Sequence, residues 1–279
     1  MEVSYNQPDA EYRKAEGQSQ SHLKCILKSP AHYESAKTFS MIPTPAMEMG
    51  TALHCRVLDG EKAFQSSYIQ KPKDINLSTK EGREWKATVG KKKILTTGGK
   101  DDPWNSVQGM TDALRKIDWF SGTDKEYIKY NEVSIYWDWL GVNCKARLDR
   151  VLVDEGIVLD LKTTDSVDAT TFQKKVVGLQ YDFQAAYYAK AAEIAYGKPF
   201  KFIFVAVERK APYCVDMFEV SPNMMREGLS KNIAALKLLK TCATLDQWPA
   251  PEPKINKLDY PRWYTPYGTS SSPILELPF

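Results

Sequence analysis

Cysteine is scarce in this sequence, and its few copies form no recognisable metal-binding pattern. Five cysteines are spread over 279 residues, and no two stand in a CxxC arrangement. An odd number of widely separated cysteines supports neither a disulfide framework nor a zinc or iron–sulfur site. The cysteines therefore indicate neither disulfide bonds nor a cofactor bound by cysteine.

Long apolar runs are also missing. No stretch approaches the roughly 18 consecutive apolar residues that cross a membrane. The first residues, MEVSYNQPDAEYRK, contain no apolar core of signal-peptide length. We therefore expect a cytoplasmic protein without a membrane partner.

The sequence also lacks a nucleotide-binding loop of the Walker type. The stretch TTGGKDD contains Gly99 and Lys100, but it lacks both the upstream glycine at Walker spacing and a following serine or threonine. ATP is therefore not expected to drive any action of this protein on a polymer.

What the sequence does contain is typical of a soluble globular protein. Hydrophobic residues make up 43% and charged residues 26% of the 279 residues, enough to bury the core of one large domain or two small ones. Lysines and arginines number 38 against 35 aspartates and glutamates, a formal charge of +3. This charge is compatible with a local basic patch but does not establish a polyanionic partner.

Hydrophobic periodicity divides the chain into a helical first part and a later part that contains strands. Helices are predicted over residues 19–30, 47–60, 78–93, 106–120, 170–197 and 222–242. The third of these is expected to open with Ser78 and Glu81 as a capping box. Strands are predicted over residues 132–140, 142–153, 156–163, 201–208 and 213–220, the first three as an antiparallel meander. The result is a mixed sheet flanked by helices, followed by a proline-rich arm.

The stretch IVLDLKT, residues 157–163, carries Asp160 and Lys162 on one face of an otherwise apolar strand. A short turn at residues 154–156 places Asp149 opposite a residue between Asp160 and Lys162. Paired carboxylates bind hard cations such as Mg²⁺, and an amine beside the metal can orient or deprotonate a water. The alternative that the hairpin leaves open is a structural ion-pair cluster at the end of the sheet.

Five further residues extend this group, each with a structural alternative. His54 lies among apolar residues, where a histidine is more often a core residue than a ligand, although imidazole completes carboxylate metal sites well. Glu132 opens the first strand of the meander. Gln180, Gln184 and Tyr188 are spaced i, i+4 and are predicted to share one helix face. That face can contact a phosphate or the attacking water, or it can be a solvated edge.

In order and spacing these residues resemble the exonuclease VIII (RecE) nuclease domain, a branch of the PD-(D/E)XK superfamily that includes lambda exonuclease. The resemblance spans about residues 21–263 and rests on the stretches MGTALHCRVL, EVSIYW, CKARLDRV, IVLDLKTT, YDFQAAYY, DQWPA and PRW. The proline of the superfamily name is absent, since Leu148 precedes Asp149. The resemblance implies an α/β (α+β) fold with a PD-(D/E)XK restriction-endonuclease-like core, a central mixed β-sheet flanked by helices, and a helical N-terminal part.

The resemblance also implies an activity and partners. It predicts an exodeoxyribonuclease that digests linear double-stranded DNA from 5′ to 3′ and leaves 3′ single-stranded tails for recombination. The expected cofactor is Mg²⁺, with Mn²⁺ as a substitute, in a two-metal mechanism. The implied partners are double-stranded DNA ends and a RecT-like single-strand annealing protein, in a phage or prophage system of a bacterial host. A homo-oligomeric ring, a tetramer, is expected to supply processivity without ATP.

Residue roles follow from the same resemblance. The expected metal ligands are His54, Asp149, Asp160 and the carbonyl of Leu161, and Lys162 is the expected catalytic lysine. Glu132, Gln184 and Tyr188 are placed near the active site together with them. Separately from the resemblance, Lys24, Lys28 and Lys37 of the N-terminal helices are expected to contact DNA, because phosphates provide most of the non-specific affinity, and a solvated helix face is the alternative. Thr163 and Gln180 are also expected to contact DNA.

Two alternatives remain, a non-cleaving DNA-binding recombination factor with the same fold and a PD-(D/E)XK endonuclease. A relative with an iron–sulfur cluster is disfavoured by the cysteine spacing. The predicted organisation is a single nuclease domain over residues 1–263, with a helical part at about 1–120 and a catalytic sheet core at about 130–245. Residues 264–279 are predicted to form an extended arm.

Overall fold

The structure is a computed structural model, and it describes residues 1–5, 7–38, 42–98, 102–121 and 129–260. The chain separates into two units, Met1–Pro249 and Ala250–Phe279. The described part of the second unit, residues 250–260, contains no helix or strand. The predicted arm at 264–279 lies outside the described residues. None of the helices in the described ranges is long and apolar enough to cross a membrane.

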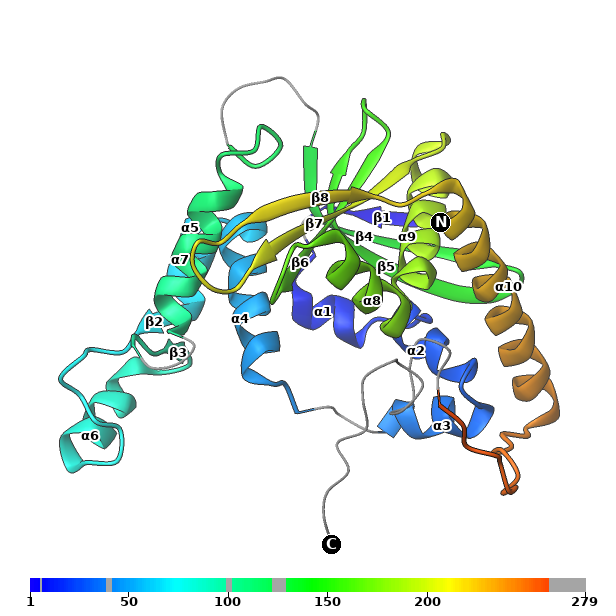
Figure 1. Cartoon of the computed structure of the whole chain (residues 1–279), viewed down its shortest axis with the longest axis horizontal. Helices are drawn as coiled ribbons and strands as arrows, with labels where there is room; N and C mark the ends of the chain where they lie inside the picture. Colours follow the sequence, from blue (N-terminus) through cyan, green and yellow to red (C-terminus); the bar gives the residue numbers. More distant parts are fainter. Residues whose placement is uncertain (6, 39–41, 99–101, 122–128, 261–279) are drawn as a thin grey trace, which may run out of the picture. The chain divides into compact units, whose positions relative to one another are not determined.

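A six-stranded mixed sheet forms the centre of the first unit, with the strand order β1-β4-β5-β6-β7-β8 (Figure 1). The strands are β1 (Glu2–Ser4), β4 (Lys129–Trp139), β5 (Val142–Leu152), β6 (Ile157–Thr164), β7 (Lys201–Glu208) and β8 (Val215–Glu219). All neighbouring pairs are antiparallel except β6 and β7, which are parallel. The predicted meander is thus confirmed as β4–β5–β6, and the two later predicted strands as β7 and β8.

Tight turns set the register of the meander. Leu140 and Gly141 join β4 to β5 with φ values of 58° and 79°. A two-residue turn with both residues at positive φ matches the twist of a hairpin. The turn before β6 contains Gly156, at φ 64°. Because each hairpin is short, the acidic residues on the three strands can lie opposite one another.

Helices cover both faces of the sheet, and as a result β7 is buried on both sides. Phe202, Phe204 and Ala206 belong to one core cluster, and their neighbours Ile203 and Val205 belong to the other. The helices that contribute to the first cluster are α2 (Gln20–Ile26), α3 (Pro30–Thr38), α8 (Ala169–Gly178), α9 (Tyr181–Tyr196) and α10 (Pro222–Leu245). Those of the second are α4 (Pro45–His54), the π-helix η1 (Cys55–Asp59), α5 (Glu61–Ser67) and α7 (Pro103–Leu114). The short α1 (Asp9–Lys14) buries no residue.

The long helix predicted over residues 170–197 is wrong, because the chain breaks between α8 and α9. Gln180 has a φ of 52° and a ψ of 52°, in the left-handed region, and precedes the first residue of α9. Hydrophobic spacing continues across the break, so the sequence pattern did not reveal it. Gln180 therefore stands at the start of α9, and the predicted face that it shares with Gln184 and Tyr188 does not form.

A small lobe, which we call the basic lobe, comprises residues 68–95. It contains β2 (Tyr68–Gln70), α6 (Lys80–Val89) and β3 (Lys93–Leu95), with β2 and β3 paired in parallel. The predicted capping box is also corrected here, since Thr79 and not Ser78 caps α6 by accepting a hydrogen bond from the backbone N–H of Gly82. The predicted helix ends at Val89, and residues 93–95 are a strand.

We predict that Gly228→Ala destabilises the fold. A Cβ atom at Gly228 in α10 would lie 2.1 Å from the backbone oxygen of Asp182 and 2.9 Å from the Cβ atom of Ala186, both in α9. Overpacking of this kind typically costs about 1–3 kcal/mol. Gly178→Ala is the matched control, because a Cβ atom there meets nothing within 4 Å. Equal free energies of unfolding for the two variants in urea would contradict the prediction.

Candidate active site

A cavity of about 900 Å³ lies in the first unit beside the meander. Its walls include residues of α4, β4, β5, β6 and α9. Among the lining residues are seven that were singled out from the sequence: His54, Glu132, Asp149, Leu161, Lys162, Thr163 and Tyr188. Residues spread over more than 130 positions of the chain are thus collected at one surface.

Three carboxylates stand on neighbouring strands at the same level of the sheet. The register pairs Asn131 with Arg150 and Val133 with Leu148, so Glu132 falls opposite Asp149. Continuing the register from the Arg150–Leu159 pair places Asp149 opposite Asp160. The turn at Gly156 therefore sets the register that the sequence predicted for Asp149.

Glu132 interrupts its strand. Its φ of 50° lies in the left-handed region, which is costly for a residue with a side chain, and residues strained in this way cluster at functional sites. Its carboxylate pairs with the guanidinium of Arg147 on β5. This ion pair holds the side chain at the cavity wall.

His54 reaches the sheet from the end of α4. Its Nε2 atom lies 2.9 Å from the carbonyl oxygen of Leu161, and its Nδ1 atom lies 3.7 Å from an Oδ atom of Asp149. A carbonyl oxygen only accepts hydrogen bonds, so Nε2 carries a hydrogen and Nδ1 is the nitrogen available to a metal. The Leu161 carbonyl, predicted as a metal ligand, here orients the imidazole.

His54, Glu132 and Asp149 form a group that fits a divalent cation. Each offers one ligand atom, and these atoms lie within 4.8 Å of one another. Burial raises the pKa of Asp149 to about 7, and the nearby negative charges of Asp160 and Glu132 add to the increase. Burial also raises the pKa of Glu132, although Arg147 opposes this effect. Two carboxylates that resist ionisation together are stabilised by a cation between them.

Asp160 is placed differently from the other two acids. Its side chain is 2% exposed, and one oxygen lies 2.5 Å from the Nζ atom of Lys162. The other oxygen accepts a hydrogen bond of 2.8 Å from the Nε2 atom of Gln184 on α9. Asp160 therefore serves as the anchor of Lys162. The sequence-based hypothesis that it is a metal ligand remains a prediction.

Lys162 keeps its charge inside this pocket. Burial by itself lowers the pKa of the amine, but the charges of Asp160 and Asp149 outweigh burial and hold the pKa above its usual value. The ammonium also lies 5.1 Å from the centre of the Tyr181 ring, a cation–π contact. Lys162 is thus a fixed cation at the cavity wall.

Tyr188 also lines the cavity, and burial raises the pKa of its hydroxyl well above the usual value.

Sequence reasoning missed several residues at the cavity. Lys145, Arg147 and Asp149 occupy alternate positions of β5, and all three line the cavity. The alternation of side chains in a strand was a signal that could have added Arg147. Arg209 follows β7 and also lines the cavity, but no local pattern distinguishes it.

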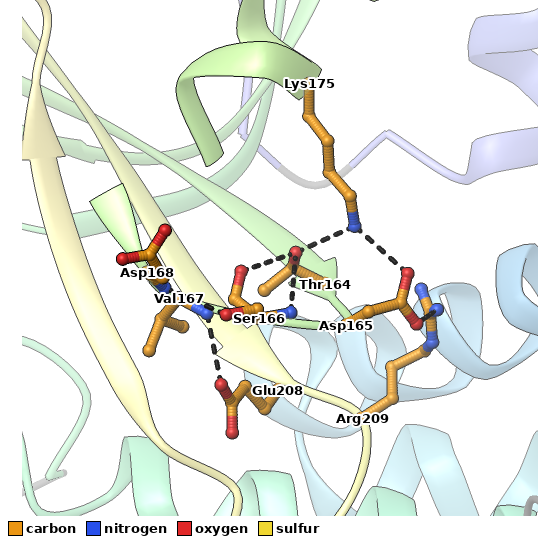
Figure 2. Close-up of polar contacts among 8 residues, drawn as sticks. All are labelled: Thr164, Asp165, Ser166, Val167, Asp168, Lys175, Glu208 and Arg209. Carbon is orange, nitrogen blue, oxygen red and sulfur yellow. Dashed lines mark hydrogen bonds and ion pairs between the residues drawn. The ribbon is translucent and has the colours of Figure 1, made fainter. Parts of the chain in front are cut away.

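A polar network connects the end of β6 to Arg209. Figure 2 shows Lys175 of α8 reaching Thr164 and Asp165, with Arg209 paired to the same aspartate. Although partial burial opposes the effect, hydrogen bonding to Lys175 and the charge of Arg209 hold the pKa of Asp165 below its usual value. The backbone N–H of Arg209 donates to the carbonyl of Thr164. Arg209 is therefore held beside the strand that carries Lys162.

The residues expected to contact DNA are dispersed. Thr163 lines the cavity, whereas Lys24, Lys28, Lys37 and Gln180 are absent from its described lining. The amine of Lys24 donates to the carbonyl of Leu179 at 2.9 Å. Lys37 pairs with Glu34 and lies 4.6 Å from the centre of the Trp248 ring. Their contacts with DNA remain a prediction.

We predict that Asp149 makes the metal-free protein lose stability, relative to Asp149→Asn, as the pH rises from about 4 to about 7. The pKa of Asp149 is about 7 in the folded protein and near 3.8 when unfolded. In this window the unfolded chain has released the proton that the folded chain still binds, so rising pH favours unfolding. The loss is up to about 1.4 kcal/mol per pH unit. Urea unfolding in EDTA at several pH values measures it, and a wild-type profile parallel to that of Asp149→Asn would contradict the prediction.

A mixed sheet with helices on both faces, and a lysine beside acidic residues of neighbouring strands, define a protein of the PD-(D/E)XK class. The chain belongs to the family described as a PDDEXK-like domain of unknown function (DUF3799), which matches residues 19–260. The predicted fold class and superfamily are therefore confirmed. No curated protein matches the chain.

A solved structure agrees with this fold. The crystal structure of a protein from Eubacterium rectale, described as a "putative exonuclease", has a TM-score of 0.59 and 12% sequence identity. The match covers 91% of this chain and 97% of that one. The structure of a protein named SSO0001 matches 51% of this chain and 61% of its own at 16% identity, with a TM-score of 0.31, too low to bear on the fold.

Proposed function

We propose that this protein is a Mg²⁺-dependent exodeoxyribonuclease that digests linear double-stranded DNA from 5′ to 3′ and leaves 3′ single-stranded tails. The observation that carries the proposal is the position of Lys162 in the same cavity as the group His54, Glu132 and Asp149. The family match supports a nuclease, and the description of the Eubacterium rectale structure supports the exonuclease type.

The residues present suit hydrolysis of a phosphodiester. His54, Glu132 and Asp149 would hold a divalent metal, which supplies Lewis-acid stabilisation of the phosphate and lowers the pKa of a bound water. Lys162 offers a fixed positive charge that can orient the attacking water or stabilise developing negative charge on the phosphate. Asp160 and Gln184 keep that amine in place.

The proposal includes an assembly and a partner. The expected assembly is a closed homo-oligomeric ring, a tetramer, because members of the family that the sequence resembles stay on their substrate by encircling the duplex. The expected partner is a single-strand annealing protein of a phage or prophage recombination system, which would take up the 3′ tail. Light scattering at working concentration tests the ring, and a monomer would contradict it.

The activity is tested with linear and circular duplexes of the same sequence, each incubated with Mg²⁺ or with EDTA. We expect the linear duplex to be digested in Mg²⁺ and to stay intact in EDTA. A label at the 5′ end should be released early, and a label at the 3′ end should be retained. Digestion of the circular duplex would indicate an endonuclease instead. Binding of the duplex without cleavage under all these conditions would indicate a DNA-binding factor.

A further inference from the structure

The basic lobe is far more positive than the rest of the chain. Residues 68–95 contain eight lysines and arginines against three aspartates and glutamates, a net charge of +5, whereas the whole chain carries +3. The remainder of the protein is therefore slightly acidic. Charge of this density on one short segment attracts polyanions.

The lobe extends from the cavity. Tyr68 and Lys93, at the starts of β2 and β3, line the cavity, and Figure 1 shows α6 lying beyond α4, on the side away from the sheet. The base is anchored, because Tyr68 stacks on Phe64 with ring centres 5.1 Å apart and Leu95 is buried in the second core cluster. A long ligand that leaves the cavity on this side would meet the lobe next.

Three lysines of the lobe are available for a ligand. Lys86, Lys91 and Lys92 are exposed, and none of them has an ion-pair partner among the described residues. On α6, Lys80, Arg83 and Lys86 are spaced i, i+3, i+6 and follow one side of the helix. The lobe also has internal support, because Gly82 packs against the backbone of Asn76 so closely that a Cβ atom there would lie 1.9 Å from the oxygen.

We propose that the basic lobe binds the phosphate backbone of duplex DNA next to the cavity and so determines how the duplex enters the site. The inference rests on the proposed function, because the cavity must receive the scissile phosphodiester for the adjoining duplex to pass the lobe. Lysines and arginines against phosphates provide most of the sequence-independent affinity for DNA, through release of counterions. A regular duplex presents such phosphates continuously, and the anchored, exposed cations of the lobe match that chemistry.

The test compares two variants with equal loss of charge. Lys91→Gln with Lys92→Gln removes two charges from the lobe. The control, Lys174→Gln with Lys237→Gln, removes two charges from exposed positions of α8 and α10, which are far from the basic lobe in sequence. Binding of a fluorescent 30-base-pair duplex is measured by anisotropy in EDTA at several salt concentrations. We expect the lobe variant to reduce the slope of log K against log salt by up to about 1.8, and the control to leave it unchanged.

Chemical footprinting locates the contact directly. Acetylation of lysines in wild-type protein should be slowed by the duplex at Lys86, Lys91 and Lys92 and unchanged at Lys174 and Lys237. Equal salt slopes for wild type and the lobe variant, together with unprotected lobe lysines, would overturn the inference. A change in oligomeric state at an unchanged salt slope would overturn it too, and would assign the lobe to subunit contacts.

The nuclease assay separates this inference from the proposed function. If the wild-type protein cuts linear duplex DNA and the lobe variant binds DNA with the wild-type salt slope, the lobe inference fails while the function stands. If the wild-type protein binds the duplex through the lobe but cuts no DNA in Mg²⁺, the nuclease proposal fails while the contact surface stands.

Discussion

Lys162→Ala is expected to lower cleavage of linear duplex DNA by about 10²–10⁴-fold, the range typical of a lost acid–base group. The amine is held 2.5 Å from Asp160 and faces the cavity, so its charge is available to the reacting phosphate or water. Binding of metal and of DNA should persist, because the residue lies outside the group His54, Glu132 and Asp149. Single-turnover cleavage and Mg²⁺-dependent thermal melts measure the two properties separately.

Lys162→Ala also leaves the buried carboxylate of Asp160 without its cation, and removing one partner of such a pair can cost about 3–5 kcal/mol. Lys162→Gln is therefore the second variant, because its amide can still donate to Asp160. Lys201→Gln is the matched control, since this exposed lysine pairs with the exposed Glu219 and is absent from the described cavity lining. Activity of Lys162→Gln within a few-fold of the control would remove Lys162 from the mechanism.

Asp149→Asn and Asp160→Asn are expected to have opposite effects on the stability of the metal-free protein. Asp149 is a partly buried carboxylate with a raised pKa, so removing its charge should preserve or increase stability near pH 8. Asp160 neutralises Lys162, so its loss should lower the free energy of unfolding by up to several kcal/mol. Both variants should lose cleavage.

Thermal melts with EDTA and with Mg²⁺, run beside the nuclease assay, separate these outcomes. We expect Asp149→Asn to lose the stabilisation by Mg²⁺ that binding to the folded state confers. The response of Asp160→Asn to Mg²⁺ decides whether that carboxylate is also a ligand. A destabilised Asp160→Asn protein that still cuts linear DNA would defeat the hypothesis that Asp160 serves the metal. An Asp149→Asn protein with wild-type Mg²⁺ stabilisation would remove Asp149 from the ligand group.

Much of the sheet could be predicted because its signals are local. Alternating apolar residues and turn glycines marked β4, β5 and β6, and a continuous apolar run marked β7. The break at Gln180 could not be predicted in the same way, because the hydrophobic spacing of α8 runs on into α9. Only the left-handed backbone at Gln180 shows where one helix ends and the next begins.

In the candidate site, too, some features were predictable from the sequence and others only from the tertiary structure. The sequence by itself determined that Asp160 and Lys162 share a face and that Asp149 lies opposite them, because strand alternation and a short turn are encoded within about a dozen residues. Only the tertiary structure decided that Glu132 lies within reach of His54 and Asp149, and that Gln184 secures Asp160. These contacts join segments far apart in the chain, such as His54 and Leu161, 107 positions apart. Their geometry depends on how α4 and α9 pack on opposite faces of the sheet, which no local pattern specifies.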